Sequence, residues 1–177
     1  RQAVARHSPA GKVPVLLDDG FAIWDTLAIA EALHDRFPAA GVWPQGLNER
    51  ARARSLCAEM HAGFGALRSH CPMNIEASLP EVGARVLAEQ PGVRADLDRL
   101  TAMWREALRA SGGPFLFGDF SIADAYFAPV VARLRTYALP VGEEIAAYGD
   151  RVWAAPGVAA WVSQALAERD FLGFEEP

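Results

Sequence analysis

Two short apolar runs near the start of the chain constrain its fold more than any other feature. Residues 13–17 and 21–24 have the composition of strands, and Asp18, Asp19 and Gly20 between them are typical of a hairpin turn. An isolated two-stranded hairpin is only marginally stable in water. We therefore expect this hairpin to belong to a larger sheet than the chain itself supplies.

Beyond the hairpin the sequence pattern becomes helical, which predicts a mostly helical α+β protein. Residues 38–48 contain Pro, Gly and Trp without periodicity and are interpreted as a linker between two domains. The expected helices are the end of one over residues 1–8, then 25–37, a single long helix over 48–70, 93–108, 121–137, 142–154 and 157–169.

Composition excludes several classes of function. The 17 basic and 22 acidic residues give a net charge of −5, which argues against nucleic acid as a partner, because phosphate binding depends on clustered cations. No apolar run approaches the roughly 20 residues that a membrane-spanning helix needs. The two cysteines form no C-x-x-C motif and no disulfide framework, which predicts a reducing compartment such as the cytoplasm.

Two local motifs are candidates for binding. Val13-Pro14 begins a strand, where proline leaves backbone groups of Val13 open to an extended peptide ligand; an ordinary edge proline is the alternative. Asp25-Thr26 lies where a strand gives way to a helix. Thr26 either caps the helix or, together with the free N–H groups of the helix, binds a carboxylate. Asp25 is suited to binding an ammonium group.

A third motif indicates a role in folding. Ser121 at an N-cap position with Asp124 three residues later approximates a capping box, in which each residue satisfies N–H groups at the start of the helix. We assign Ser121 and Asp124 to folding and not to catalysis.

Taken together, these motifs resemble those of the cytosolic glutathione S-transferase family, in a bacterial branch related to the zeta class. The resemblance covers residues 8–170. It is carried by Ser-Pro-Ala-Gly-Lys-Val-Pro-Val-Leu from Ser8, Trp-Asp-Thr-Leu-Ala-Ile-Ala-Glu-Ala-Leu from Trp24, Glu-Met-His-Ala-Gly-Phe from Glu59, Pro-Met-Asn from Pro72, and Phe-Leu-Phe-Gly-Asp-Phe-Ser-Ile-Ala-Asp-Ala from Phe115.

The resemblance implies a division into two domains and a glutathione site. Residues 1–38 correspond to the C-terminal half of a thioredoxin-like, glutathione-binding domain, residues 39–48 to a linker, and residues 49–177 to an all-helical domain. A cis Val13–Pro14 bond would let Val13 pair with the cysteinyl backbone of glutathione. Asp25 and Thr26 would hold the γ-glutamyl group, and Lys12 would lie near the ligand.

The catalytic residue is not identified by this resemblance. The family's thiol-activating Ser, Tyr or Cys lies in a strand–helix–strand segment that would precede Arg1. For the second substrate, Met60, Phe64 and Arg68 would share one face of the helix over 48–70, and Arg68 would orient an acidic electrophile. The alternative is that these residues belong to the core of the protein, as Met and aromatic residues at this spacing often do.

The expected function is transfer of glutathione to small hydrophobic electrophiles, or their isomerisation, through the glutathione thiolate. A zeta-like maleylacetoacetate isomerase and a non-enzymatic binding or regulatory module are the alternatives. Glutathione is the expected co-substrate, without a metal, since Cys57 and His61 supply only two potential ligands. The resemblance also implies a homodimer formed through the helices over 26–37 and 48–70.

Overall fold

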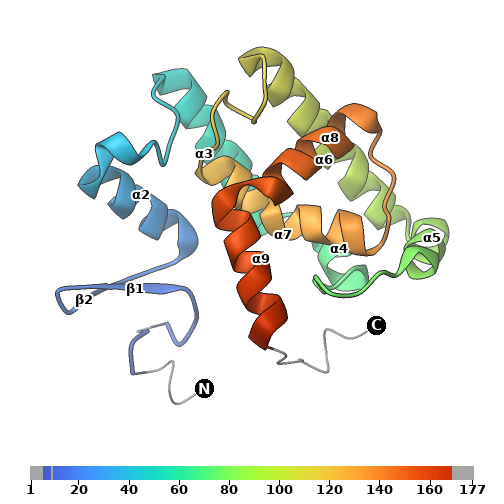
Figure 1. The fold of residues 1–177 in the computed structure, drawn as a ribbon, viewed down its shortest axis with the longest axis horizontal. Helices are drawn as coiled ribbons and strands as arrows, with labels where there is room; N and C mark the ends of the chain where they lie inside the picture. Colours follow the sequence, from blue (N-terminus) through green and yellow to red (C-terminus); the bar gives the residue numbers. More distant parts are fainter. Residues whose placement is uncertain (1–5, 9, 169–177) are drawn as a thin grey trace.

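The computed structural model describes residues 6–8 and 10–168 and has the expected mostly helical α+β architecture. Figure 1 shows the hairpin and α2 on one side of the molecule and the helical array from α3 to α9 on the other. In chain order the elements are β1 (Val15–Asp18), β2 (Phe21–Trp24), α2 (Thr26–Arg36), the 3-10 helix η1 (Pro38–Ala40), α3 (Leu47–Ala62), α4 (Gly65–His70), α5 (Pro80–Glu89), α6 (Pro91–Ser111), α7 (Ile122–Thr136), α8 (Glu143–Ala154) and α9 (Pro156–Glu168).

The hairpin forms as predicted, with its turn at Asp19 and Gly20. Both residues have positive φ, 46° and 83°, which matches the twist of the flanking antiparallel strands. Val15 pairs with Trp24. Between residues 10 and 168 the named sheet contains only β1 and β2, and the side chains of Leu17 and Trp24 remain 49% and 45% exposed. The hairpin thus offers apolar surface that this part of the chain does not cover.

Charged side chains fasten α2 to α3. The Arg54 guanidinium donates two hydrogen bonds to the Glu31 carboxylate, at 2.6 and 2.7 Å, and lies 5.5 Å from the ring centre of buried Trp43. The paired arginine lowers the pKa of Glu31. Arg50 also donates to Nε2 of His34, at 2.9 Å. These contacts fix the position of α2, whose first turn carries the Asp25-Thr26 motif.

The prediction of one helix over residues 48–70 is wrong. α3 ends at Ala62, with Gly63 as its C-cap, and α4 begins only at Gly65. Between them Phe64 has a φ of 57°, in the left-handed region, and its side chain is buried to 6% exposure. Burial of this phenyl ring against the core compensates for a backbone conformation that a non-glycine residue rarely adopts.

Two other helical expectations need correction. The structure contains α5 over Pro80–Glu89, which the sequence pattern did not predict. Gly83 in this helix approaches the end of α7 so closely that a Cβ atom would lie 1.9 Å from the carbonyl oxygen of Tyr137. At the other end of the chain, Arg6 and His7 lie in a turn and not in a helix; residues 1–5 and 169 of the expected helices lie outside the described residues.

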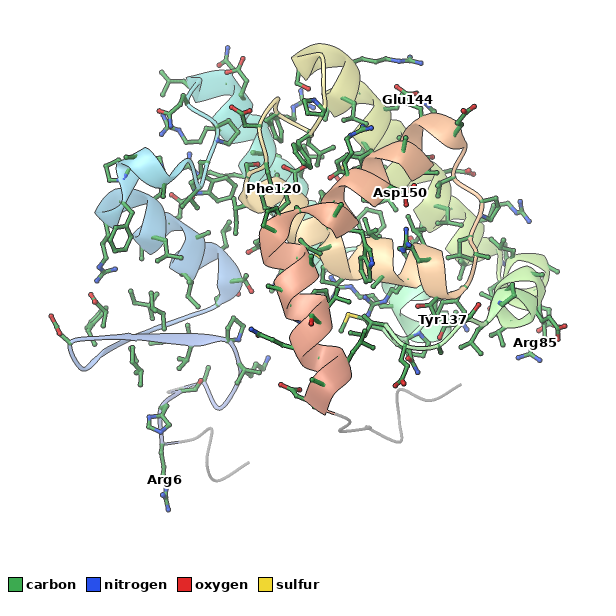
Figure 2. All side chains as sticks on the ribbon, viewed as in Figure 1. Arg6, Arg85, Phe120, Tyr137, Glu144 and Asp150 are labelled. Carbon is green, nitrogen blue, oxygen red and sulfur yellow. The ribbon has the colours of Figure 1, made fainter. Side chains whose placement is uncertain are left out.

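α7 passes through the centre of the helical array. Figure 2 shows Phe120, just before α7, on the side of the array that faces α2, and Tyr137, just after it, on the side of α5. Ten residues of α7 are buried. Trp104 of α6 packs edge-on against Phe127 of α7, with the ring centres 5.2 Å apart, and against Tyr148 of α8, at 5.0 Å. Such aromatic contacts stabilise the core beyond the area that they bury.

The start of α7 is fixed by the carboxylate of Asp124, which is fully buried. It accepts hydrogen bonds from the backbone N–H of Ser121 at 2.9 Å and of Leu116 at 3.1 Å, and from the hydroxyl of Tyr148 at 3.0 Å. Burial raises the pKa of Asp124, and these donors act in the opposite direction. One side chain therefore joins the loop before α7, α7 itself and α8.

We expect Asp124→Ala to lower the free energy of unfolding by about 3 kcal/mol, because several buried donors lose their acceptor. For a chain of this size the melting temperature should fall by roughly 6–12 °C. Thermal and urea unfolding measure the change. Asp98→Ala, on the exposed face of α6, is the control and should shift the melting temperature by less than about 2 °C. Equal stability of the two variants would contradict the role of Asp124.

Candidate functional site

The candidate ligand edge is the segment that leads into β1. The Val13–Pro14 peptide bond is cis, and the Val13 side chain is 74% exposed. Because Val15 pairs with Trp24, the antiparallel register brings Val13 to the end of the hairpin where α2 begins. The preceding turn is built by buried Ser8, whose Oγ accepts the backbone N–H of Lys12 at 3.1 Å. Lys12 and Val13 are therefore exposed beside the start of α2.

At the start of α2 the N-cap is Asp25 and not Thr26, which corrects the sequence-based assignment. Asp25 has a φ of 73°, and its Oδ1 accepts the N–H of Leu27 at 2.9 Å. Thr26 becomes the first helical residue. Since Asp25 already caps the helix, the Thr26 hydroxyl is left for another partner, beside N–H groups that favour an anion.

A histidine from the helical region lies beside this pair. Nε2 of His61, in the last turn of α3, is 3.8 Å from Oδ2 of Asp25. The sequence pattern relates His61 only to Cys57, as a potential pair of metal ligands. No local pattern links residues 25 and 61, so this contact depends on the packing of α2 against α3.

The three residues expected to line a second-substrate pocket do not share the face of a single helix, because the helix is broken between Ala62 and Gly65. Phe64 is buried in the core, while Met60 and Arg68 lie on either side of the break between α3 and α4. The Arg68 guanidinium donates to the carbonyl oxygens of Met60 and His61, the latter at 3.1 Å. Arg68 thus satisfies carbonyl groups at the end of α3, which would otherwise lack partners. The glycines at 63 and 65 are the sequence signal that could have indicated this break.

A cavity of about 610 Å³ lies elsewhere, between α3 and α6. Its floor includes the buried side chains of Leu56, Met103 and Leu116. Ion pairs on its rim join Glu59 to Arg99, at 2.5 Å, and Arg52 to Glu106, at 3.5 Å. The residues of the Asp25-Thr26 motif and of the expected second-substrate pocket are not among its lining residues.

Neither cysteine has the environment of a nucleophile. Both side chains are fully buried. Burial, with the nearby charge of Asp124, raises the pKa of Cys57 to about 12. Burial also raises the pKa of Cys71 to about 11, although Arg133 partly opposes this. Since the thiolate is the reactive form, both thiols are protonated and unreactive at neutral pH.

Potential metal ligands are scattered over the described part of the chain. Within residues 6–8 and 10–168, His, Cys, Asp and Glu side chains form no group of three or more that could hold a metal ion. Across the same residues, no helix combines the length and the apolar character needed to cross a membrane.

Two protein-family models match this chain. The family model described as "Glutathione S-transferase, C-terminal domain" matches residues 48–164, and that described as "Glutathione S-transferase, N-terminal domain" matches residues 1–36. The chain belongs to the glutathione S-transferase family. Within this family fold, the hairpin and α2 form part of a thioredoxin-like domain, and the helical domain follows.

Solved structures of glutathione transferases share the fold. A glutathione transferase homolog from Burkholderia, crystallised with bound glutathione, is 28% identical with a TM-score of 0.68; the match covers 90% of this chain and 76% of that chain. A glutathione transferase from Methylococcus capsulatus is 26% identical with a TM-score of 0.63, covering 92% and 77% of the two chains.

The curated relative matches over a shorter stretch. Dichloromethane dehalogenase from Methylorubrum extorquens is 40% identical over 48 residues, which make up 27% of this chain. The stretch spans only 17% of the dehalogenase.

We expect both cysteines of the folded protein to resist Ellman's reagent at pH 8. With a pKa of about 12, the thiolate fraction of Cys57 is roughly a thousandfold below that of an unfolded cysteine. Absorbance at 412 nm follows the reaction with and without urea, and Cys57→Ser and Cys71→Ser assign each thiol. Reaction of either one at the same rate in folded and unfolded protein would contradict the assignment.

Proposed function

We propose that this protein is a glutathione transferase that conjugates or isomerises small hydrophobic electrophiles through the glutathione thiolate, in the cytoplasm. The supporting observation is that two complementary features lie at one end of the hairpin. Val13, exposed before β1, offers backbone groups to a peptide, and Thr26 with the start of α2 offers a hydroxyl and helix N–H groups to a carboxylate. Glutathione is a peptide with a free γ-glutamyl carboxylate.

The proposed roles of the site residues derive from this arrangement. Val13, held by Pro14, pairs with the cysteinyl backbone of glutathione, and Thr26 binds the γ-glutamyl carboxylate. Asp25 binds the γ-glutamyl ammonium through Oδ2, because Oδ1 is occupied by the cap. The Lys12 ammonium attracts the glycyl carboxylate.

The second substrate is proposed to approach from the end of α3, where Met60 lies. Arg68 and Phe64 act there through the shape of the break, since the Arg68 guanidinium is bonded to carbonyl groups and the Phe64 ring is buried. An activity screen with glutathione and a panel of electrophiles, including maleylacetone, separates conjugation from isomerisation. Glutathione binding without turnover would instead favour a binding module.

We expect Thr26→Ala to weaken glutathione binding about tenfold, because a hydrogen bond to a charged carboxylate is lost. The melting temperature should change by less than about 2 °C, since Asp25 and not Thr26 caps the helix. Isothermal titration calorimetry measures the affinity. Thr101→Ala, at a threonine on α6 whose hydroxyl bonds only within its own helix, is the matched control. Unchanged affinity in Thr26→Ala would refute the assignment of Thr26.

We further propose that the protein is a homodimer in which the groove between α3 and α6 faces a second copy. The groove combines an apolar floor with rim charges of both signs, so the same surface is complementary to itself across a twofold axis. Leu47, at the start of α3, is 78% exposed, and Phe37, at the end of α2, is 57% exposed. A dimer would remove both apolar side chains from water.

Sedimentation equilibrium should give twice the mass of one chain, and Leu47→Asp should shift the equilibrium towards monomer by at least tenfold, because it places a charge in the apolar contact. Leu166→Asp, at an exposed leucine on α9, should leave the mass unchanged. A monomeric wild-type protein would overturn the dimer without affecting the assignment of Thr26.

A further inference from the structure

Tyr126, in the first half of α7, has a buried hydroxyl without a defined role in the fold. The residue is 8% exposed, and its hydroxyl oxygen has no hydrogen-bond partner among the described residues. Its surroundings include Thr26 and Asp25 at the start of α2 and Cys57 of α3. The hydroxyl therefore extends from the helical domain towards the candidate glutathione site.

Tyr148 provides a comparison within the same core. Its hydroxyl is also buried, but it donates to the Asp124 carboxylate at 3.0 Å. Buried tyrosine hydroxyls usually have a partner of this kind, because an unsatisfied one destabilises the folded protein by about 1–3 kcal/mol. The difference between Tyr148 and Tyr126 indicates that the hydroxyl of Tyr126 serves something other than stability.

The neighbour best placed to use this hydroxyl is Thr26. The two side chains are near enough for Thr26 to favour the ionised form of Tyr126, although no complete hydrogen bond joins them in the free protein. Burial is the larger influence and raises the pKa of Tyr126 to about 12. At neutral pH Tyr126 is thus a neutral hydroxyl with a proton to donate.

Thr26 can accept that proton and still bind a ligand. A hydroxyl has one donor hydrogen and two acceptor lone pairs, and the cap at Asp25 leaves all of them open in Thr26. Accepting a bond from Tyr126 would direct the Thr26 hydrogen away from α7. It would also strengthen the bond that Thr26 donates, because linked hydrogen bonds polarise one another.

We propose that Tyr126 is a positioning residue of the glutathione site: its hydroxyl donates to Thr26 and orients the Thr26 hydroxyl towards the γ-glutamyl carboxylate. This inference rests on the proposed binding of glutathione at Thr26. It gives the helical domain a direct part in binding the γ-glutamyl end. Asp124 lies two residues before Tyr126. The buried carboxylate that fixes the start of α7 therefore also fixes the backbone position of Tyr126.

The test compares Tyr126→Phe with Tyr148→Phe, two substitutions that remove the same atom. Tyr126→Phe should raise the dissociation constant for glutathione about fivefold and leave the melting temperature of the free protein unchanged or slightly higher, because in the free protein this buried hydroxyl makes no complete hydrogen bond. Tyr148→Phe should lower the melting temperature by several degrees and leave the affinity unchanged. Calorimetric titration and thermal unfolding give the two readouts.

A double-variant cycle tests whether Tyr126 acts through Thr26. If it does, Tyr126→Phe should weaken binding in wild-type protein but have little further effect in Thr26→Ala, so that the two changes are not additive. Additive effects, or a Tyr126→Phe variant that loses stability but keeps its affinity, would overturn the inference. Wild-type protein that fails to bind glutathione would overturn the proposed function, and the inference with it.

Discussion

The arrangement at the centre of the helical domain depends on how one buried carboxylate is satisfied. A carboxylate without partners cannot remain in a protein core, so Asp124 holds the loop before α7, the first turn of α7 and the Tyr148 hydroxyl of α8 in one arrangement. Trp104 then packs across the same junction. The helices fixed in this way provide the surface against which α3 packs. The arginines of α3 then hold α2 in place.

The candidate glutathione site is therefore built from two parts of the chain with different physical origins. The hairpin and the start of α2 supply exposed backbone groups and the Thr26 hydroxyl, which local sequence determines. The helical domain supplies His61 beside Asp25 and, as we infer, Tyr126 behind Thr26. The ion pair of Glu31 with Arg54 and the contact of Arg50 with His34 hold these two parts in register. Loss of these contacts between α2 and α3 would alter the ligand site, although none of the residues involved binds the ligand.

Sequence reasoning succeeded where the signal was local. The Asp-Gly turn and the start of α7 each depend on residues within one turn, and the structure has both. It failed where contacts between residues far apart in the sequence determine the local conformation. Phe64 adopts its left-handed conformation because its ring is buried, and the N–H of Leu67 at the start of α4 is satisfied by Asp96 of α6, at 2.9 Å. The contacts of His61 and Tyr126 with the start of α2 are equally beyond any local pattern.

The break between α3 and α4 constrains the number of residues in this segment during evolution. Each residue added to a helix rotates the remainder of that helix by about 100°. One residue inserted in α4 before Leu67 would turn Leu67 away from Asp96 and Arg68 away from the end of α3, whereas several side chains in the same stretch are exposed and free to vary. Homologous proteins should therefore differ in composition across this segment while keeping its number of residues, and insertions should accumulate in loops that bear no such paired contacts.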